Sequence, residues 1–155
     1  MSAPLEVRVI GQPAPQGSKR ALGRGVMVES SRAVKPWRAA VATATAARMH
    51  AHRHPGWPTG PITVTVTFFL PRPTSLPKRV AWPAKRPDLD KYIRATLDGL
   101  TESGIWHDDA QVVTLHARKR YAANGQPLGA YIAIHPGPTV NGSSSHPPST
   151  GASSR

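Results

Sequence analysis

Residues 85–113 have the sequence KRPDLDKYIRATLDGLTESGIWHDDAQVV and hold most of the acidic side chains of the chain. The 155 residues contain 8 aspartates and glutamates against 20 lysines and arginines, which gives a formal net charge of +12. Six of the eight acids fall in this segment, namely Asp88, Asp90, Asp98, Glu102, Asp108 and Asp109. A basic chain that collects its carboxylates in one place indicates a local task for them.

The segment predicts a helix that starts near its first aspartate. Asp88 follows a proline in the position of an N-cap, and the helical pattern ends around Glu102, before the residues SGIW. Apolar residues recur at helical spacing and form the expected buried stripe, which consists of Leu89, Ile93, Leu97 and Leu100. Polar residues follow a neighbouring stripe along the edge of that face, namely Asp90, Arg94, Asp98 and Thr101.

Carboxylates gathered in this way are typical of a metal site. An N-cap residue is not helical in its backbone, so the side chain of Asp88 can turn toward Asp90. If the strand after the helix packs beside the helix start, Asp108 or Asp109 supplies a third carboxylate. Like charges at close range repel one another unless a cation neutralises them. Mg²⁺ and Mn²⁺ take such oxygen ligands and assist phosphodiester cleavage, so the sequence predicts a metal-dependent nuclease site.

A second interpretation needs no metal. Acids at the start of a helix favour the helix dipole, and Asp90–Arg94 and Arg94–Asp98 have the spacing of ordinary ion pairs along a helix. Asp88 is then only a cap. Under this interpretation the chain is a non-catalytic, basic nucleic-acid-binding protein, and affinity of the carboxylates for divalent metal is the property that separates the two hypotheses.

The rest of the chain predicts an α+β domain, a mixed sheet of about four strands with two helices packed on it. Alternating or β-branched runs and turn signals place strands at 5–11, 62–70, 111–121 and 129–135. A first helix is expected from about Val34 to Ala51, with Ser30 or Ser31 as its cap and Pro36 in its first turn. The last two strands are expected to be joined by a turn at the Asn-Gly pair of AANGQPL.

The predicted domain covers residues 1–135. Residues 136–155 are rich in proline, glycine and serine and have few large apolar side chains, so we expect a disordered tail. The chain starts without a basic segment followed by an apolar run, and its longest apolar run, ITVTVTFFL, is far shorter than the roughly 20 residues that cross a bilayer. We therefore expect a soluble, cytoplasmic protein with no membrane association.

Composition narrows the remaining choices. The chain has no cysteine, which excludes disulfides and cysteine-ligated zinc or iron–sulfur sites. The histidines of MHAHRH (49–54) are a compositional hint of zinc binding, but they fall at a helix end, where histidine also favours the helix dipole. The sequence pI of about 11.3 indicates a polyanionic partner, and nucleic acid is the commonest one.

Several basic residues flank the acids and are the expected contacts to DNA phosphates. Along their strand Arg118 and Arg120 are expected on one face and Lys119 apart from them, so not all of these side chains can reach the same phosphate. Trp82 and Trp106 bracket the segment; the second is expected in the core because it enters the sheet. The predicted DNA-binding set is Lys19, Arg20, Lys85, Arg86, Lys91, Arg118 and Lys119.

The acidic segment resembles the RusA family of Holliday-junction resolvases, which are found widely in phages and prophages. The resemblance is carried by DLDKYIRATLDGL (88–100) and GIWHDDAQVV (104–113), and it is strong over residues 85–121. It extends more faintly to GQPAPQGSKR (11–20), which is similar to the basic, proline-rich loop that follows the first strand in the family.

The resemblance implies a metal-dependent endodeoxyribonuclease that cleaves four-way junctions in recombination and repair. The three metal-binding aspartates of the family fall on Asp88, Asp90 and Asp109. An essential lysine of the family falls on Arg94, and arginine keeps the charge but stays protonated at any working pH. Lys91, which stands where the commoner pattern has asparagine, is the other residue for that role.

The resemblance also implies a homodimer, with Mg²⁺ or Mn²⁺ as cofactor. If a phage encodes the chain, the protein is expected in the host cytoplasm. Two sites would then nick two opposed strands of a junction. A nuclease for other branched DNA, such as flaps and forks, remains open beside the resolvase. The non-catalytic nucleic-acid-binding protein remains open as well.

Overall fold

The computed structural model describes residues 3–17 and 27–138 of the chain. Its elements follow in the order β1 (Leu5–Ile10), α1 (Met27–Ala51), β2 (Ile62–Leu70), α2 (Leu89–Ser103), the 3-10 turn η1 (Asp109–Gln111), β3 (Val112–Tyr121) and β4 (Gly129–Pro136). The prediction of an α+β domain with a mixed four-stranded sheet and two helices is confirmed. The predicted contacts Lys19 and Arg20 and most of the predicted tail lie outside the described residues.

The sheet has the strand order β1-β4-β2-β3. β3 runs parallel to β2, whereas β4 is antiparallel to β1 and to β2. The expected turn forms at Asn124–Gly125, but the strands it joins are not neighbours, because β2 lies between them. The reason is the crossover through α2, which returns the chain parallel to β2 on one side and leaves the other side of β2 to β4.

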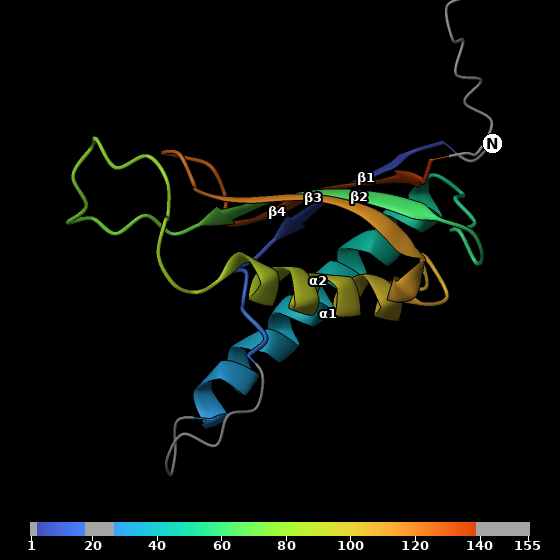
Figure 1. Cartoon of the computed structure of the whole chain (residues 1–155), viewed down its shortest axis with the longest axis horizontal. Coiled ribbons are helices and arrows are strands. Elements are labelled where there is room, and N and C mark those ends of the chain that lie inside the picture. The colour runs from blue at the N-terminus through green and yellow to red at the C-terminus, as the bar shows by residue number, and fades with distance from the viewer. Residues whose placement is uncertain (1–2, 18–26, 139–155) are drawn as a thin grey trace, which may run out of the picture.

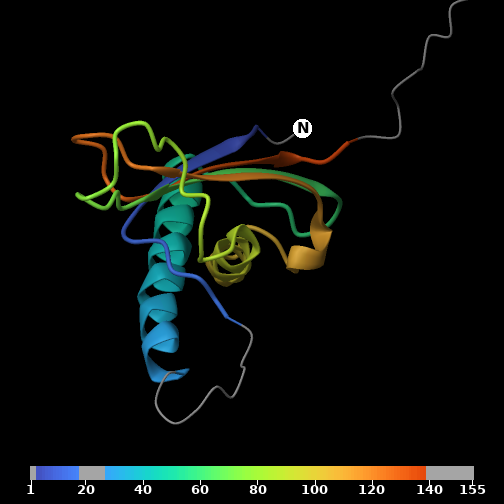
Figure 2. The same ribbon diagram turned by 60° about the vertical axis from the view of Figure 1, so that its left-hand side comes forward.

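Both helices cover the same face of the sheet (Figures 1 and 2). The row Val7, Ile132 and Val66 crosses three strands on that face and is buried. In the described chain no helix covers the opposite face, which we call the open face and which carries Arg8, Tyr131, Thr67 and Arg118 as its matching row. The hydrophobic core therefore lies in a single layer between sheet and helices.

The first helix begins earlier than predicted. α1 starts at Met27, so Ser30, Ser31 and Pro36 lie inside it rather than at its start. A proline in a helix interior lacks one backbone hydrogen bond. The helix nevertheless continues through this point, because Val34 and Trp37 on either side of the proline are buried in the core and hold the backbone in place.

The buried face of α2 also differs from the prediction. Its buried residues are Tyr92, Ala95, Thr96, Gly99 and Leu100, whereas the predicted stripe residues Leu89, Ile93 and Leu97 are only partly buried. The cause is the close crossing of α1, since a Cβ atom added at Gly99 would lie 2.8 Å from the Cβ of Val41. Small residues allow this close approach, and the three larger apolar side chains are left only partly buried.

The domain boundary near residue 135 stays a prediction; β4 ends at Pro136, one residue beyond it. Among the residues described, no helix is both long and apolar enough to cross a membrane.

Candidate active site at the two ends of one helix

The N-terminal end of α2 carries the first predicted ligand. Asp88 occupies the N-cap position, with φ −70° and ψ 146°, as predicted. Its exposed carboxylate makes no capping hydrogen bond, however. The side chain is therefore not committed to stabilising the helix, which weakens the interpretation of Asp88 as a simple cap.

Asp90 lies in the first turn of the same helix and is paired with its neighbour. Its Oδ2 is 3.0 Å from Nζ of Lys91, and the hydrogen bond from Lys91 lowers the pKa of Asp90 from its ordinary value. Within the described part of the chain, neither the Asp90–Arg94 nor the Arg94–Asp98 ion pair forms. The exposed guanidinium of Arg94 therefore extends from the helix without a carboxylate partner there.

Lys119 connects β3 to the loop before Asp88. Its Nζ donates hydrogen bonds to the carbonyl oxygens of Lys85, at 2.6 Å, and Pro87, at 2.7 Å. This side chain points to the helix side of the sheet, whereas Arg118 pairs in register with Thr67 on the open face. The predicted split of the two residues is confirmed, and Lys119 acts as a clamp on the backbone that leads to Asp88.

The other end of α2 carries the remaining acids. Asp108 caps η1, and its Oδ1 accepts a hydrogen bond of 2.8 Å from the backbone N–H of Ala110. Gln111 completes the arrangement, since its Oε1 accepts hydrogen bonds from the backbone N–H groups of Asp108 and His107. Asp108 therefore orders the turn, which leaves the carboxylate of Asp109 without a structural task.

A cleft of about 280 Å³ opens at this second end. Partial burial raises the pKa of Asp109, and the nearby carboxylates of Asp108 and Asp98 raise it further. The predicted site set did not contain Asp98, although its place on the polar stripe of the helix was a signal. Arg38 of α1 pairs with Glu102 at the rim. The cleft is lined by Arg38, Asp98, Thr101, Glu102, His107, Asp108 and Asp109.

The two groups of carboxylates stand apart. We call Asp88 and Asp90 the N-terminal pair, and Asp98, Asp108 and Asp109 the C-terminal cluster. Ten residues separate Asp88 from Asp98, which corresponds to about 15 Å along a helix axis. Within residues 3–17 and 27–138, no three histidine, aspartate or glutamate side chains gather as a metal site requires.

The expectation that Asp88, Asp90 and Asp109 converge within one chain is therefore wrong. It depended on the strand after α2 packing beside the helix start, but β3 begins at the far end of the helix. The parallel crossover dictates this, because α2 must run back along the sheet before β3 can start parallel to β2. A single chain does not assemble the predicted metal ligands.

The other residues singled out in the sequence as DNA contacts, zinc ligands or stacking side chains have the following positions. Lys85 and Arg86 are exposed on the loop that ends at Asp88. His54 has a structural role, since its Nδ1 accepts from the backbone of Gly56 and its Nε2 lies 2.9 Å from the carbonyl oxygen of Ala3. Trp106 is buried, as predicted, and Trp82 is 54% exposed, with the guanidinium of Arg120 5.8 Å from its ring centre.

Comparison with known proteins supports the sequence interpretation. The family described as endodeoxyribonuclease RusA matches residues 10–135. The uncharacterized protein YqaN of Bacillus subtilis (strain 168) is 29% identical over 133 residues, which cover 76% of this chain and 88% of that protein. The region matched by the family includes both ends of α2 and the strands β2, β3 and most of β4, whereas only the last residue of β1 falls within it.

Proposed function

Because the chain belongs to the RusA endodeoxyribonuclease family, we propose that it is a metal-dependent nuclease for four-way (Holliday) junction DNA. Mg²⁺ or Mn²⁺ is the proposed cofactor, and the active form is a homodimer. The observation that carries the proposal is the separation of the carboxylates along α2, since among the described residues neither end gathers by itself the three side chains of a metal site. We assign the two parts of one site to different subunits.

A two-fold axis through the middle of α2 would set two copies of this helix antiparallel. The N-terminal pair of one subunit then lies beside the C-terminal cluster of its partner, and the same happens at the other end of the interface. Such a dimer has two complete sites rather than one. Two sites are what symmetric nicking of a four-way junction requires.

The surface around α2 supports this arrangement. Leu89, Ile93 and Leu97 leave a partly exposed apolar stripe on the helix, and Leu115 and Val113 of the adjacent strand β3 are 37% and 58% exposed. Apolar side chains that remain accessible on neighbouring elements are typical of interfaces. The charges are complementary as well, because Lys85, Arg86 and Lys91 accompany the N-terminal pair, whereas acids outnumber cations at the other end of the helix.

The residues at the two ends suit the chemistry of phosphodiester cleavage. A divalent cation held by such carboxylates supplies charge neutralisation and a more acidic water. Arg94 is placed to contact a phosphate, but its guanidinium cannot donate a proton at working pH, so its role is electrostatic. Lys91 pairs with Asp90, and Lys85 and Arg86 supply positive charge before Asp88.

The first test uses a labelled synthetic four-way junction and a linear duplex of matching sequence. Each is incubated with purified protein in Mg²⁺, in Mn²⁺ and in chelator. We expect symmetric nicks in the junction only, and only with metal. Binding without cleavage under every metal condition would contradict the proposal and favour the non-catalytic nucleic-acid-binding protein.

Mixing of inactive variants tests the shared site. If each site takes Asp90 from one subunit and Asp109 from the other, a heterodimer of Asp90→Asn and Asp109→Asn subunits keeps one intact site. Equal mixing should then restore about a quarter of wild-type nicking, because half of the dimers are heterodimers with half of their sites intact. A mixture of Asp88→Asn and Asp90→Asn is the control and should stay inactive. Absence of rescue in both mixtures would contradict the shared site.

A further inference from the structure

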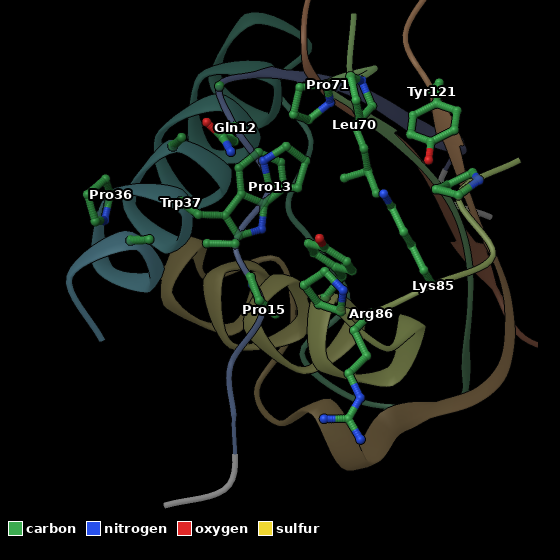
Figure 3. Close-up of a pocket in the computed structure, with 18 residues that line it drawn as sticks. Gln12, Pro13, Pro15, Pro36, Trp37, Leu70, Pro71, Lys85, Arg86 and Tyr121 are labelled. Atoms are coloured by element: carbon green, nitrogen blue, oxygen red, sulfur yellow. The ribbon is translucent and has the colours of Figure 1, made fainter. Parts of the chain in front are cut away.

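A second cavity, of about 570 Å³, is bordered by the loop that precedes Asp88 (Figure 3). Most of its walls come from the segment 11–15 after β1, the helix α1 and the loop between β2 and α2, and Leu70 of β2, Tyr92 of α2 and Tyr121 of β3 complete them. Pro13 and Trp37 form one side of it, and Tyr121 and Leu70 lie across from them. Pro87, one residue before Asp88, also lines it.

The chemistry of this cavity is aromatic and apolar, with positive charge at its rim. Tyr92, Tyr121 and Trp37 contribute rings, and seven prolines contribute flat apolar surface. None of the lining residues is acidic, whereas Lys85 and Arg86 are cationic. Lys85 extends across the opening and Arg86 points away from it. The occupant is therefore expected to be flat, apolar on its faces and attached to negative charge.

Two polar groups inside the cavity have no partner in the described chain. Tyr92 is 4% exposed and Tyr121 is 9% exposed, and neither phenol hydroxyl takes part in a hydrogen bond there. The indole N–H of Trp37 is by contrast already used, since it donates to Oγ1 of Thr96 at 3.1 Å. Neither hydroxyl is among the buried atoms that lack a partner, so both stay accessible and can bond the polar edges of a ligand in the cavity.

We propose that this cavity holds one unstacked nucleobase of the junction DNA, from a nucleotide next to the phosphate that is cut. A base has two aromatic faces, which suit the rings and prolines, and polar edges, which suit the two tyrosine hydroxyls. Its phosphate reaches the cations at the rim. This inference rests on the proposed function and adds a binding site that the carboxylates do not supply.

The position of the cavity explains why a branched substrate would use it. Removing a base from a continuous duplex costs its stacking and pairing, whereas a base at a branch point has already lost part of both. Because the cavity lies one residue from Asp88, a base held in it places the adjoining phosphate at the N-terminal pair. Intact duplex would be bound less well because its bases cannot enter.

The test combines the removal of one base from the DNA with a substitution that fills the cavity of the protein, and it measures whether the two effects on affinity depend on each other. Ala33 is exposed on α1 and lines the cavity, so Ala33→Trp fills the space without touching the core. Ala39 is exposed on the same helix but does not line the cavity, so Ala39→Trp is the matched control. Affinity is measured in chelator for junctions that carry a single abasic nucleotide at successive positions beside the crossover.

We expect that at one position the abasic nucleotide weakens binding of the wild type and of Ala39→Trp about tenfold, as loss of one stacked base does. The same change should weaken binding of Ala33→Trp less than about twofold, because the filled cavity no longer holds the base. Equal losses in all three proteins, or no loss at any position, would overturn the proposal.

Photo-crosslinking gives an independent measurement. A junction with 5-iododeoxyuridine at the sensitive position is irradiated with the protein in chelator, and the linked peptide is identified by mass spectrometry. We expect links to Tyr92, Tyr121 or Trp37 that disappear in Ala33→Trp. Links to the exposed Trp82 alone would overturn the cavity as the binding place of the base.

These outcomes separate the inference from the proposed function. If the junction is cut with metal but shows no position-dependent coupling, the nuclease assignment stands and the base site is wrong. If the coupling is present but no metal supports cutting, the base site stands and the nuclease assignment is wrong. A protein that does not bind junctions at all would overturn both.

Discussion

The two ends of α2 carry the same kind of side chain in opposite electrostatic surroundings. At the N-terminal end, Asp90 is held by Lys91 and the pKa of its carboxyl is lowered. At the C-terminal end, partial burial and the carboxylates of Asp108 and Asp98 raise the pKa of Asp109. Asp90 is therefore paired with a cation, whereas Asp109 has no cationic partner in the described chain.

This difference shows that a group of acids in a sequence need not be a group in space. In the N-terminal pair Asp90 is already compensated by Lys91, whereas the carboxylate of Asp109 in the C-terminal cluster has no cationic partner in the described chain and gains most from a bound cation. When the N-terminal end of one subunit lies beside the C-terminal end of its partner, the two ends together offer carboxylates for a metal and also basic side chains for a phosphate. The difference between the ends is therefore the basis of the proposed shared site.

The largest expected effect is loss of cleavage on Asp90→Asn. The change removes a proposed metal ligand, so we expect nicking of the junction to fall about a thousandfold or more. Junction affinity should stay the same or increase, because one repulsive charge is gone. Nicking and binding of a labelled junction are measured side by side, with Glu6→Gln, at an exposed acid on β1 away from both ends of α2, as the control. Loss of binding in Asp90→Asn would count against the assignment.

The second largest loss of nicking is expected on substitution of Arg94. Comparing it with Lys91 identifies which side chain stabilises the charge of the reacting phosphate. We expect Arg94→Ala to lower nicking about a hundredfold by removing charge stabilisation, while Arg94→Lys keeps most of the activity. Lys91→Ala should lower nicking by less than Arg94→Ala. The nicking rate is measured in single turnover at saturating protein, and the reverse order of the two alanine variants would give the role to Lys91.

A smaller effect is expected where the N-terminal end is fastened to the sheet. Lys119→Met removes two hydrogen bonds to the backbone before Asp88, so we expect a loss of about 1–2 kcal/mol in the free energy of unfolding. Tm should fall by about 3–6 °C. Nicking should fall about tenfold, because Asp88 is less well placed. Lys78→Met, at an exposed residue of the same loop, is the control and should change neither quantity.

The smallest expected effect is a change in thermal stability on substitution of Asp109, in the C-terminal cluster of α2. Because the pKa of Asp109 is raised on folding, the folded chain binds its proton more tightly than the unfolded chain. The charged form of Asp109 therefore lowers the free energy of unfolding at neutral pH. This penalty disappears as the pH falls through the raised pKa of the folded chain toward 3.8, the ordinary pKa of an aspartate. Asp109→Asn should raise Tm by about 1–2 °C at neutral pH.

Thermal unfolding of Asp109→Asn at several pH values in chelator checks this sign. The gain over the wild type should shrink as the pH approaches 3.8, where the wild-type carboxyl is also neutral. A gain that grows toward acid would contradict the stated direction of the pKa shift. Saturating Mg²⁺ should reduce the gain if the dimer binds metal at this carboxylate.

Much of the fold followed from local patterns. The strand 62–70 was predicted with the bounds that β2 has, because its β-branched and aromatic residues are bounded by prolines. Asp88 was predicted at the helix start that it occupies, and Trp106 in the core where it lies. In each of these places the short-range signal and the tertiary packing agree.

The rest required tertiary information. The start of α1 was missed because Ser30, Ser31 and Pro36 resemble a helix start, while the buried side chains around the proline keep the helix going. The buried face of α2 was misplaced because Gly99 admits α1 at close range, which no pattern of large apolar residues shows. The distance between the carboxylates depends on the strand order, and the segment alone does not contain it.

The separation of the carboxylates along α2 also has a consequence for dosage. If a complete site needs two chains, the number of sites at low abundance grows with the square of the number of chains. A few chains made by chance then form almost no complete sites and leave the genome intact, whereas a rapid increase in chain number raises the cutting activity steeply. Fifteen helical residues would thus act as a concentration threshold for an enzyme whose product is broken DNA.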